Sequence, residues 1–199
     1  MQEVYHRVKN NLQIVSSLLN QQASALSDEH VRKVLFDMHN RVRSMALIHQ
    51  GLYQSEDLAH IGFADYIRDL ATSLFHSYEG IEEKIALRLE IGEIALGLET
   101  AIPCGLILNE LVTNAFKYAF PDGKTGEVLI DLRDGPGAAC VLKVRDNGIG
   151  LPPNVDFDNP TTLGLRLVQD LTYQLGGRIE INREGGTEFA LTFSDEPHA

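Results

Sequence analysis

Three polar side chains on one helical face carry the clearest potential for chemistry in this chain. Glu110, Asn114 and Lys117 are separated by four and three residues, so a helix places them along one line, here called the polar seam. An asparagine amide oxygen is a hard ligand suited to Mg²⁺, and a lysine ammonium can meet a phosphate as a point charge. Apolar residues surround the seam, which favours a buried helix with one functional edge. A salt-bridged surface helix is the alternative interpretation.

A glycine-rich turn follows a strand-like run further along the chain. Asp146 precedes Gly148 and Gly150 in the segment Asp-Asn-Gly-Ile-Gly. A carboxylate here can accept a hydrogen bond from the exocyclic amine of adenine, a donor that guanine lacks at that place. The two glycines allow the backbone to approach a ligand closely and leave the next segment free to move as a lid. A plain Asp-Asn-Gly turn is the alternative.

A third segment opens a helical pattern with donors suited to phosphate. Thr161 and Thr162 predict an N-cap, and Gly164 and Leu165 follow in the first turn. The first amides of a helix lack intrahelical acceptors and lie at its positive end, so those of Gly164 and Leu165 would receive phosphate oxygens. The three segments together predict a site for ATP and Mg²⁺.

The elements that must position these residues follow from hydrophobic periodicity. Apolar residues recur at threes and fours in two N-terminal segments joined by a short turn, which predicts a helical hairpin whose apolar stripe needs a partner. A polar segment over 54–62 predicts a linker. Helical and alternating patterns then mix, which favours an α+β sandwich with helices on one face of a mainly antiparallel sheet. The predicted helices are 3–25, one that begins at 29 and has apolar positions up to 48, 63–78, 98–120 and 161–175. The predicted strands are 85–91, 128–132, 140–145, 178–182 and 188–193.

Composition excludes several classes of protein. The 199 residues carry a formal charge of -11 with a pI near 5.0, which argues against a nucleic-acid surface. No apolar run approaches the roughly 18 residues that a membrane span requires, and the N-terminus lacks the order of a signal peptide, so we expect a cytoplasmic protein. Cys104 and Cys140 lack metal-ligand spacing and predict two buried free thiols.

The polar seam, the glycine-rich turn and the Gly164 segment, in this order, resemble the N, G1 and G2 boxes of the GHKL (HATPase_c) ATPase fold of histidine kinases, gyrase, Hsp90 and MutL. The run from His6 to Gln13, His-Arg-Val-Lys-Asn-Asn-Leu-Gln, resembles the phosphoacceptor box of the HisKA_2 subfamily of sensor histidine kinases. Two departures are Tyr5, where the subfamily often has a second histidine, and Thr162, where the G2 box often has glycine. The absence of tryptophan excludes the related class with a His-Trp-Glu signature.

The resemblance implies a two-component signalling kinase. His6 would accept the γ-phosphoryl group of ATP, and an aspartate of a response-regulator receiver would take it next. Glu110 is our hypothesis for the general base, because Arg7 stands where other histidine kinases often carry an acid. Thr187 resembles the family's threonine near the adenine. Two alternatives stay open: an inactive signalling module of the same fold, and a GHKL ATPase that acts on another target.

The same resemblance predicts the domain organisation. Residues 1–60 would form the dimerisation and phosphotransfer hairpin, giving a four-helix bundle in a homodimer, and residues 61–199 would form the ATP-binding domain. The start at Met1, directly before a predicted helix, predicts that a sensor domain precedes this sequence.

Overall fold

Two long antiparallel helices, α1 (Gln2–Ala25) and α2 (Glu29–Gln54), form the N-terminal hairpin. The computed structural model describes residues 2–54, 61–78, 80–153 and 155–195. Asp28 caps α2, because its Oδ1 accepts a hydrogen bond from the amide of Val31 at 3.2 Å. Ser16 Oγ lies 3.0 Å from Nδ1 of His39, which fixes the turns of the two helices that face each other. The predicted hairpin is confirmed, whereas most of the predicted linker, residues 55–60, lies outside the described residues.

In the described part of the chain the main sheet has five strands. The strand order is β2 (Ile85–Ile91), β4 (Gly126–Asp134), β5 (Ala139–Asp146), β7 (Thr187–Ser194) and β6 (Arg178–Asn182). In this sheet β2 and β4, at one edge, are parallel, and the other neighbouring pairs are antiparallel. A short antiparallel ladder, β1 (Ile61–Gly62) with β3 (Ala95–Leu96), was not predicted, because two residues show no periodicity.

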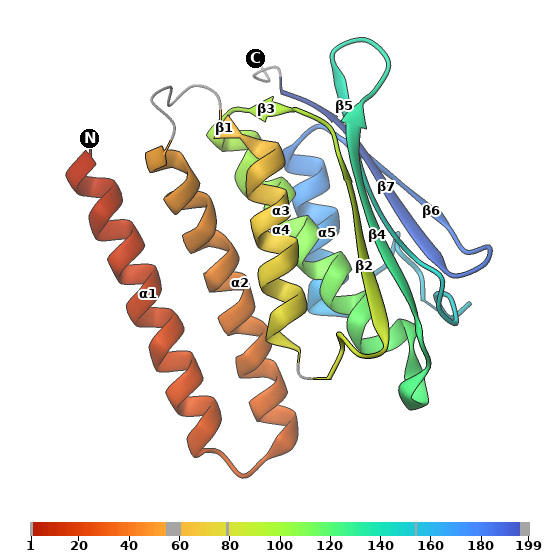
Figure 1. Ribbon diagram of the computed structural model, residues 1–199, viewed down its shortest axis with the longest axis horizontal. Helices are drawn as coiled ribbons and strands as arrows, with labels where there is room; N and C mark the ends of the chain where they lie inside the picture. Colours follow the sequence, from red (N-terminus) through yellow and green to blue (C-terminus); the bar gives the residue numbers. More distant parts are fainter. Residues whose placement is uncertain (1, 55–60, 79, 154, 196–199) are drawn as a thin grey trace.

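Three helices cover one face of this sheet, as Figure 1 shows: α3 (Phe63–Ser77), α4 (Leu98–Asn114) and α5 (Leu163–Gln174). Alternate residues of β4 point into the layer between them, and Val128, Ile130 and Leu132 are fully buried there. The predicted α+β sandwich is therefore confirmed. Cys104 and Cys140 are buried free thiols, as expected.

Helix α4 ends earlier than its sequence pattern predicted. The α-helix stops at Asn114, a π-helical turn, η1, covers Ala115–Ala119, and a 3-10 turn, η2, follows over Pro121–Gly123. Apolar spacing within a single turn does not separate an α-helix from a π-helix, so the predicted boundary at residue 120 missed this change. The π-helical turn, which is wider than an α-helical one, carries Lys117.

The hairpin lies against the helical layer through α2. Figure 1 places α2 between α1 and the α3/α4 layer, and α2 packs against both α3 and α4. Aromatic rings fill part of this interface: Tyr78 packs edge-on against Phe36 of α2 at 5.5 Å and against Phe116 of η1 at 5.6 Å between ring centroids. Among the described helices, none is both long and apolar enough to cross a membrane.

Candidate nucleotide site

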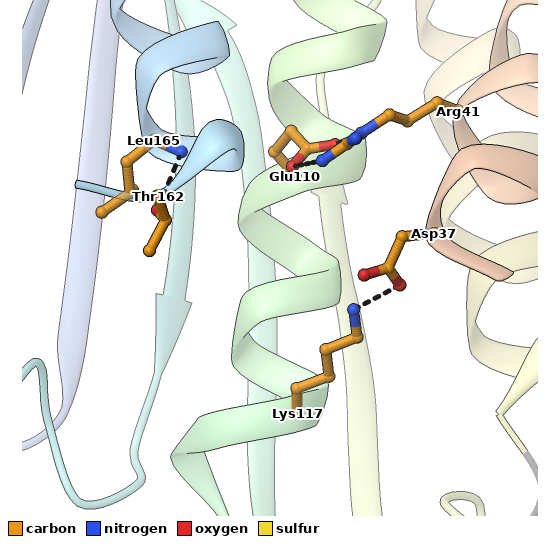
Figure 2. Close-up of polar contacts among 6 residues, drawn as sticks. All are labelled: Asp37, Arg41, Glu110, Lys117, Thr162 and Leu165. Carbon is orange, nitrogen blue, oxygen red and sulfur yellow. Dashed lines mark hydrogen bonds and ion pairs between the residues drawn. The ribbon is translucent and has the colours of Figure 1, made fainter. Parts of the chain in front are cut away.

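The Glu110 end of the polar seam is engaged by the hairpin. Glu110 is only 5% exposed, and Arg41 of α2 binds both of its carboxylate oxygens. The Arg41 Nε lies 2.5 Å from Oε1, and Nη2 lies 2.8 Å from Oε2 (Figure 2). Hydrogen bonding to Glu110 raises the pKa of the Arg41 guanidinium. The carboxylate is therefore held as one half of a bidentate ion pair.

The Lys117 end of the seam is engaged in the same way. Its ammonium donates a hydrogen bond to Oδ1 of Asp37, which lies one turn before Arg41 on α2 (Figure 2). The alternative interpretation, a salt-bridged helix, therefore describes two of the three seam residues, although the helix is buried rather than on the surface. Sequence reasoning missed Asp37 and Arg41. Their spacing of four residues on α2 was the available signal, but it names no partner across the interface.

Between the two ion pairs the interface is polar and buried. Asn40 is 2% exposed and Thr113 is 7% exposed, and both lie beside the hydroxyl of Tyr78. Burial raises the pKa of Tyr78 to about 12, so its hydroxyl stays protonated at neutral pH. The contact between α2 and α4 therefore contains buried polar groups and is not purely apolar.

Asn114 ends α4 and is partly buried, directly before the π-helical turn. In the described ranges, no three His, Cys, Asp or Glu side chains are grouped so that they could hold a metal ion. Mg²⁺ does not require such a cage, because it commonly takes one or two protein oxygens and completes its shell with water and phosphate oxygens. The amide oxygen of Asn114 fits that requirement.

Asp146 ends β5 and is held by two backbone amides. Its Oδ1 accepts hydrogen bonds from the amide of Gly148 at 2.9 Å and from that of Thr187 at 3.2 Å. Thr187 is the strand partner of Asp146 at the start of β7, which brings these two predicted adenine-site residues together. Burial raises the pKa of Asp146, and the two amides oppose the shift only in part.

The glycine-rich turn is shaped by the protein itself. A Cβ on Gly148 would lie 2.2 Å from the carbonyl oxygen of Ala119, which shows that Gly148 packs against the π-helical turn. Gly150 has φ +80°, a conformation that favours glycine. The amide of Ile149 donates to the same Ala119 oxygen at 2.9 Å. The sequence predicted that Gly148 lets the backbone approach a ligand closely. In the structure, the close neighbour of Gly148 is the backbone of Ala119.

Helix α5 begins as predicted, with Thr162 as its N-cap. The hydroxyl of Thr162 accepts a hydrogen bond from the amide of Leu165 at 3.4 Å (Figure 2). The expectation that the Leu165 amide lacks an acceptor is therefore wrong, because the threonine that replaces the family's glycine supplies one. Gly164 lies against the seam, since a Cβ there would be 2.5 Å from Oε2 of Glu110.

The predicted phosphoacceptor lies on the other layer of the molecule. His6 is in the second turn of α1, and its side chain lies outside the described residues. The structure thus brings Asp146 together with Thr187, and Glu110 together with Gly164. The helix that carries His6, α1, packs on α2.

Comparison with known proteins identifies the two parts of the chain. A family model described as histidine kinase matches residues 3–78. A second model, described as histidine kinase-, DNA gyrase B- and HSP90-like ATPase, matches residues 100–197. The chain belongs to the histidine-kinase family. The ATPase part of this family implies ATP binding, and the predicted HisKA_2 resemblance is confirmed.

Curated relatives are longer than this histidine-kinase core. Sensor histidine kinase PdtaS of Mycolicibacterium smegmatis is 32% identical over 196 residues, covering 96% of this chain and 38% of that protein. Blue-light-activated histidine kinase 2 of Erythrobacter litoralis is 30% identical over 195 residues, covering 93% of this chain and 53% of that protein. The chain therefore spans about half or less of these relatives.

Solved structures share the fold over almost the whole chain. The blue-light activated histidine kinase EL346 of Erythrobacter litoralis superposes with a TM-score of 0.75 at 27% identity, covering 98% of this chain and 58% of that chain. Acinetobacter baumannii histidine kinase AdeS gives a TM-score of 0.55 at 19% identity, covering 94% of this chain and 98% of that chain, which shows the fold alone.

Proposed function

We propose that this chain is the kinase core of a sensor histidine kinase, which phosphorylates His6 with ATP and passes the phosphoryl group to an aspartate of a response-regulator receiver. One observation supports it most: the glycine-rich turn and the Gly164 segment both lie against α4 and η1, which carry the polar seam. The glycine-rich turn bonds to Ala119, and Gly164 lies against Glu110. This proximity of segments that are far apart in the sequence supports a single nucleotide site.

The site residues suggest a role for each group in phosphoryl transfer. Asp146, with Thr187 beside it, would accept the adenine amine, and Lys117 with the Gly164 amide would bind phosphate oxygens. Gly148 and Gly150 would shape the turn over the nucleotide. When bound, Mg²⁺ would neutralise phosphate charge, with Asn114 as its protein ligand.

In the chemical step, a neutral imidazole nitrogen of His6 attacks the γ-phosphorus in line. The new N–P bond forms as the bond to the ADP oxygen breaks, and the imidazole proton passes to a base, for which Glu110 is our candidate. If Glu110→Gln binds ATP and labels at the wild-type rate, another group is the base.

The exposed apolar face of the hairpin supports a homodimer. Both of its helices carry large hydrophobic side chains that are 39% to 58% exposed in the single chain: Ile14, Val15, Leu18, Val31, Val34 and Met38. A second hairpin packed on this face would complete a four-helix bundle. Light scattering should therefore give twice the chain mass, and Leu18→Glu should shift it to one chain mass. A single-chain mass for the wild type would contradict the homodimer.

The direct test of the proposed function is incubation with γ-labelled ATP and Mg²⁺, with His6→Gln as the control. We expect label in the wild type only, lost in acid and stable in base, followed by transfer to a receiver domain. Measurable ATP binding without any label would contradict autophosphorylation and favour an inactive signalling module. Label that persists in His6→Gln would contradict the assignment of His6.

A further inference from the structure

Two ion pairs join α2 of the hairpin to α4 and to η1, and their charges are complementary. On α2 the charged residues are Asp37 and Arg41, one turn apart, and on the facing helix they are Lys117 and Glu110, two turns apart. The earlier residue of α2 meets the later residue of the α4 segment, so the two helices run antiparallel along the contact. Acid and base alternate on both sides, which selects this one register.

Each of these pairs engages a side chain that the proposed function needs elsewhere. Asp37 holds the Lys117 ammonium at hydrogen-bond distance and offsets its positive charge, so a phosphate oxygen has to compete with this carboxylate for Lys117. Glu110 is buried with both carboxylate oxygens bound to Arg41, so a histidine from either subunit of a dimer cannot reach it. Both engaged partners belong to the hairpin, which also carries the phosphoacceptor.

The helix register places the acceptor away from Glu110 in this arrangement. Ser16 faces His39, so His6, ten residues earlier on α1, is level with residue 49 of α2. Arg41, which holds Glu110, lies eight residues before that level. At a rise of 1.5 Å per residue this is a distance of about 12 Å along the helix axis. Proton transfer needs hydrogen-bond contact, and in the docked arrangement both carboxylate oxygens of Glu110 are bound to Arg41.

We propose that Asp37 and Arg41 form a latch that holds the kinase in a non-transferring state, and that nucleotide phosphate opens it by competing with Asp37 for Lys117. This inference rests on the proposed function, because it assigns a phosphate to Lys117. Asp37 and Lys117 keep 28% and 24% of their side chains exposed, so solvent weakens their pair and an incoming phosphate can displace the carboxylate. Among the described residues, loss of this pair leaves Arg41 with Glu110 as the charged side-chain contact between α2 and α4, which weakens the hold on the hairpin.

The test measures nucleotide affinity in the full chain. Asp37→Asn keeps the size of the side chain and removes its charge, which frees Lys117, so ATP should bind about fivefold more tightly than to wild type. Glu29→Gln is the matched control, because it removes one negative charge from the same helix at an exposed pair with Lys33. The control should bind ATP like wild type. Circular dichroism checks that both variants fold.

A double variant tests whether the effect acts through Lys117. Lys117→Met should weaken ATP binding, and adding Asp37→Asn to it should then change nothing. At saturating ATP, Asp37→Asn should also label His6 faster than Glu29→Gln does. Equal affinities and rates for Asp37→Asn and Glu29→Gln, in a wild type that binds ATP and labels His6, would overturn the latch alone. A wild type that binds no nucleotide would overturn the proposed function and the latch together.

Discussion

Arg41 of α2 holds Glu110 of α4 by both carboxylate oxygens, at 2.5 Å and 2.8 Å. This pair ties the helical hairpin to the helix that carries the polar seam. The carboxylate side chain is 6% exposed and the arginine side chain 20% exposed, so the two partners differ in how readily water can replace the lost contact. That difference gives the first prediction.

Removal of Arg41 should cost more stability than removal of the Glu110 charge. Arg41→Met leaves a buried carboxylate without its counter-ion, which costs about 3 kcal/mol, whereas Glu110→Gln leaves an arginine that can turn toward solvent, at about 1 kcal/mol. Chemical denaturation with both variants measures the difference. Lys33→Met, which breaks the exposed pair with Glu29, should leave the midpoint unchanged. Equal losses for the two partners would contradict the burial argument.

Gly148→Ala should destabilise the protein by sterics alone. The new Cβ would lie 2.2 Å from the carbonyl oxygen of Ala119, so the turn and η1 must separate, at a cost of about 1–3 kcal/mol. Gly62→Ala is the control, since its nearest heavy atom is Asp65 Oδ2 at 3.8 Å and its φ is -61°. In thermal melts, Gly148→Ala should therefore unfold at a lower temperature than Gly62→Ala. Similar melting temperatures would show that the turn yields without cost.

The parts of the fold predicted correctly depend on local patterns. Apolar periods of 3.6 and 2 fixed the hairpin, the sheet strands and α5, and the residue type of Thr162 fixed its cap. The contact between Arg41 and Glu110 joins residues 69 positions apart, and no local pattern indicates such a pair. Its partner choice depends on how two helices dock, which is decided by tertiary packing around Tyr78 and Phe116.

The candidate site shows the same division. Asp146 was predicted from its residue type and from the resemblance, and Thr187 from the resemblance alone; the strand register then pairs them. The role of Gly148 against Ala119 was not predictable, because a glycine that avoids a ligand and a glycine that avoids its own backbone look identical in sequence. The division into residues 1–60 and 61–199 stays a prediction, as do the individual site assignments.

Thr162→Ala should weaken the start of α5. It removes the hydroxyl that accepts from the Leu165 amide, which costs about 1 kcal/mol, while Thr162→Gly restores the residue common in the family and should cost only about a few tenths. Urea denaturation separates the two. Loss of the cap also exposes the Leu165 amide, so Thr162→Gly should bind ADP at least as well as wild type. Weaker ADP binding by Thr162→Gly would indicate that the threonine itself contacts the nucleotide.

Asp146→Asn should weaken nucleotide binding without lowering the stability of the fold. Because Oδ1 is bound by the amides of Gly148 and Thr187, an asparagine placed there turns its NH₂ group toward the adenine amine, donor against donor. ADP affinity should fall roughly 10- to 100-fold by calorimetry. Wild-type ADP affinity should also fall as the pH is lowered, because the Asp146 carboxyl takes up a proton. This loss should begin at a higher pH than for an ordinary aspartate, because burial raises the pKa of Asp146.

The same substitution should not lower the melting temperature at pH 7. A carboxyl whose pKa is raised by folding binds its proton more tightly in the native state, so its contribution to stability is present at low pH and is lost as pH rises through the folded-state pKa. The neutral amide of the Asp146→Asn variant avoids that loss, so the variant should melt at or above the wild-type temperature at neutral pH, with the difference shrinking toward pH 4. A variant that melts lower at pH 7 and also binds ADP weakly would show that Asp146 supports the fold, and its role at the adenine would then need separate evidence.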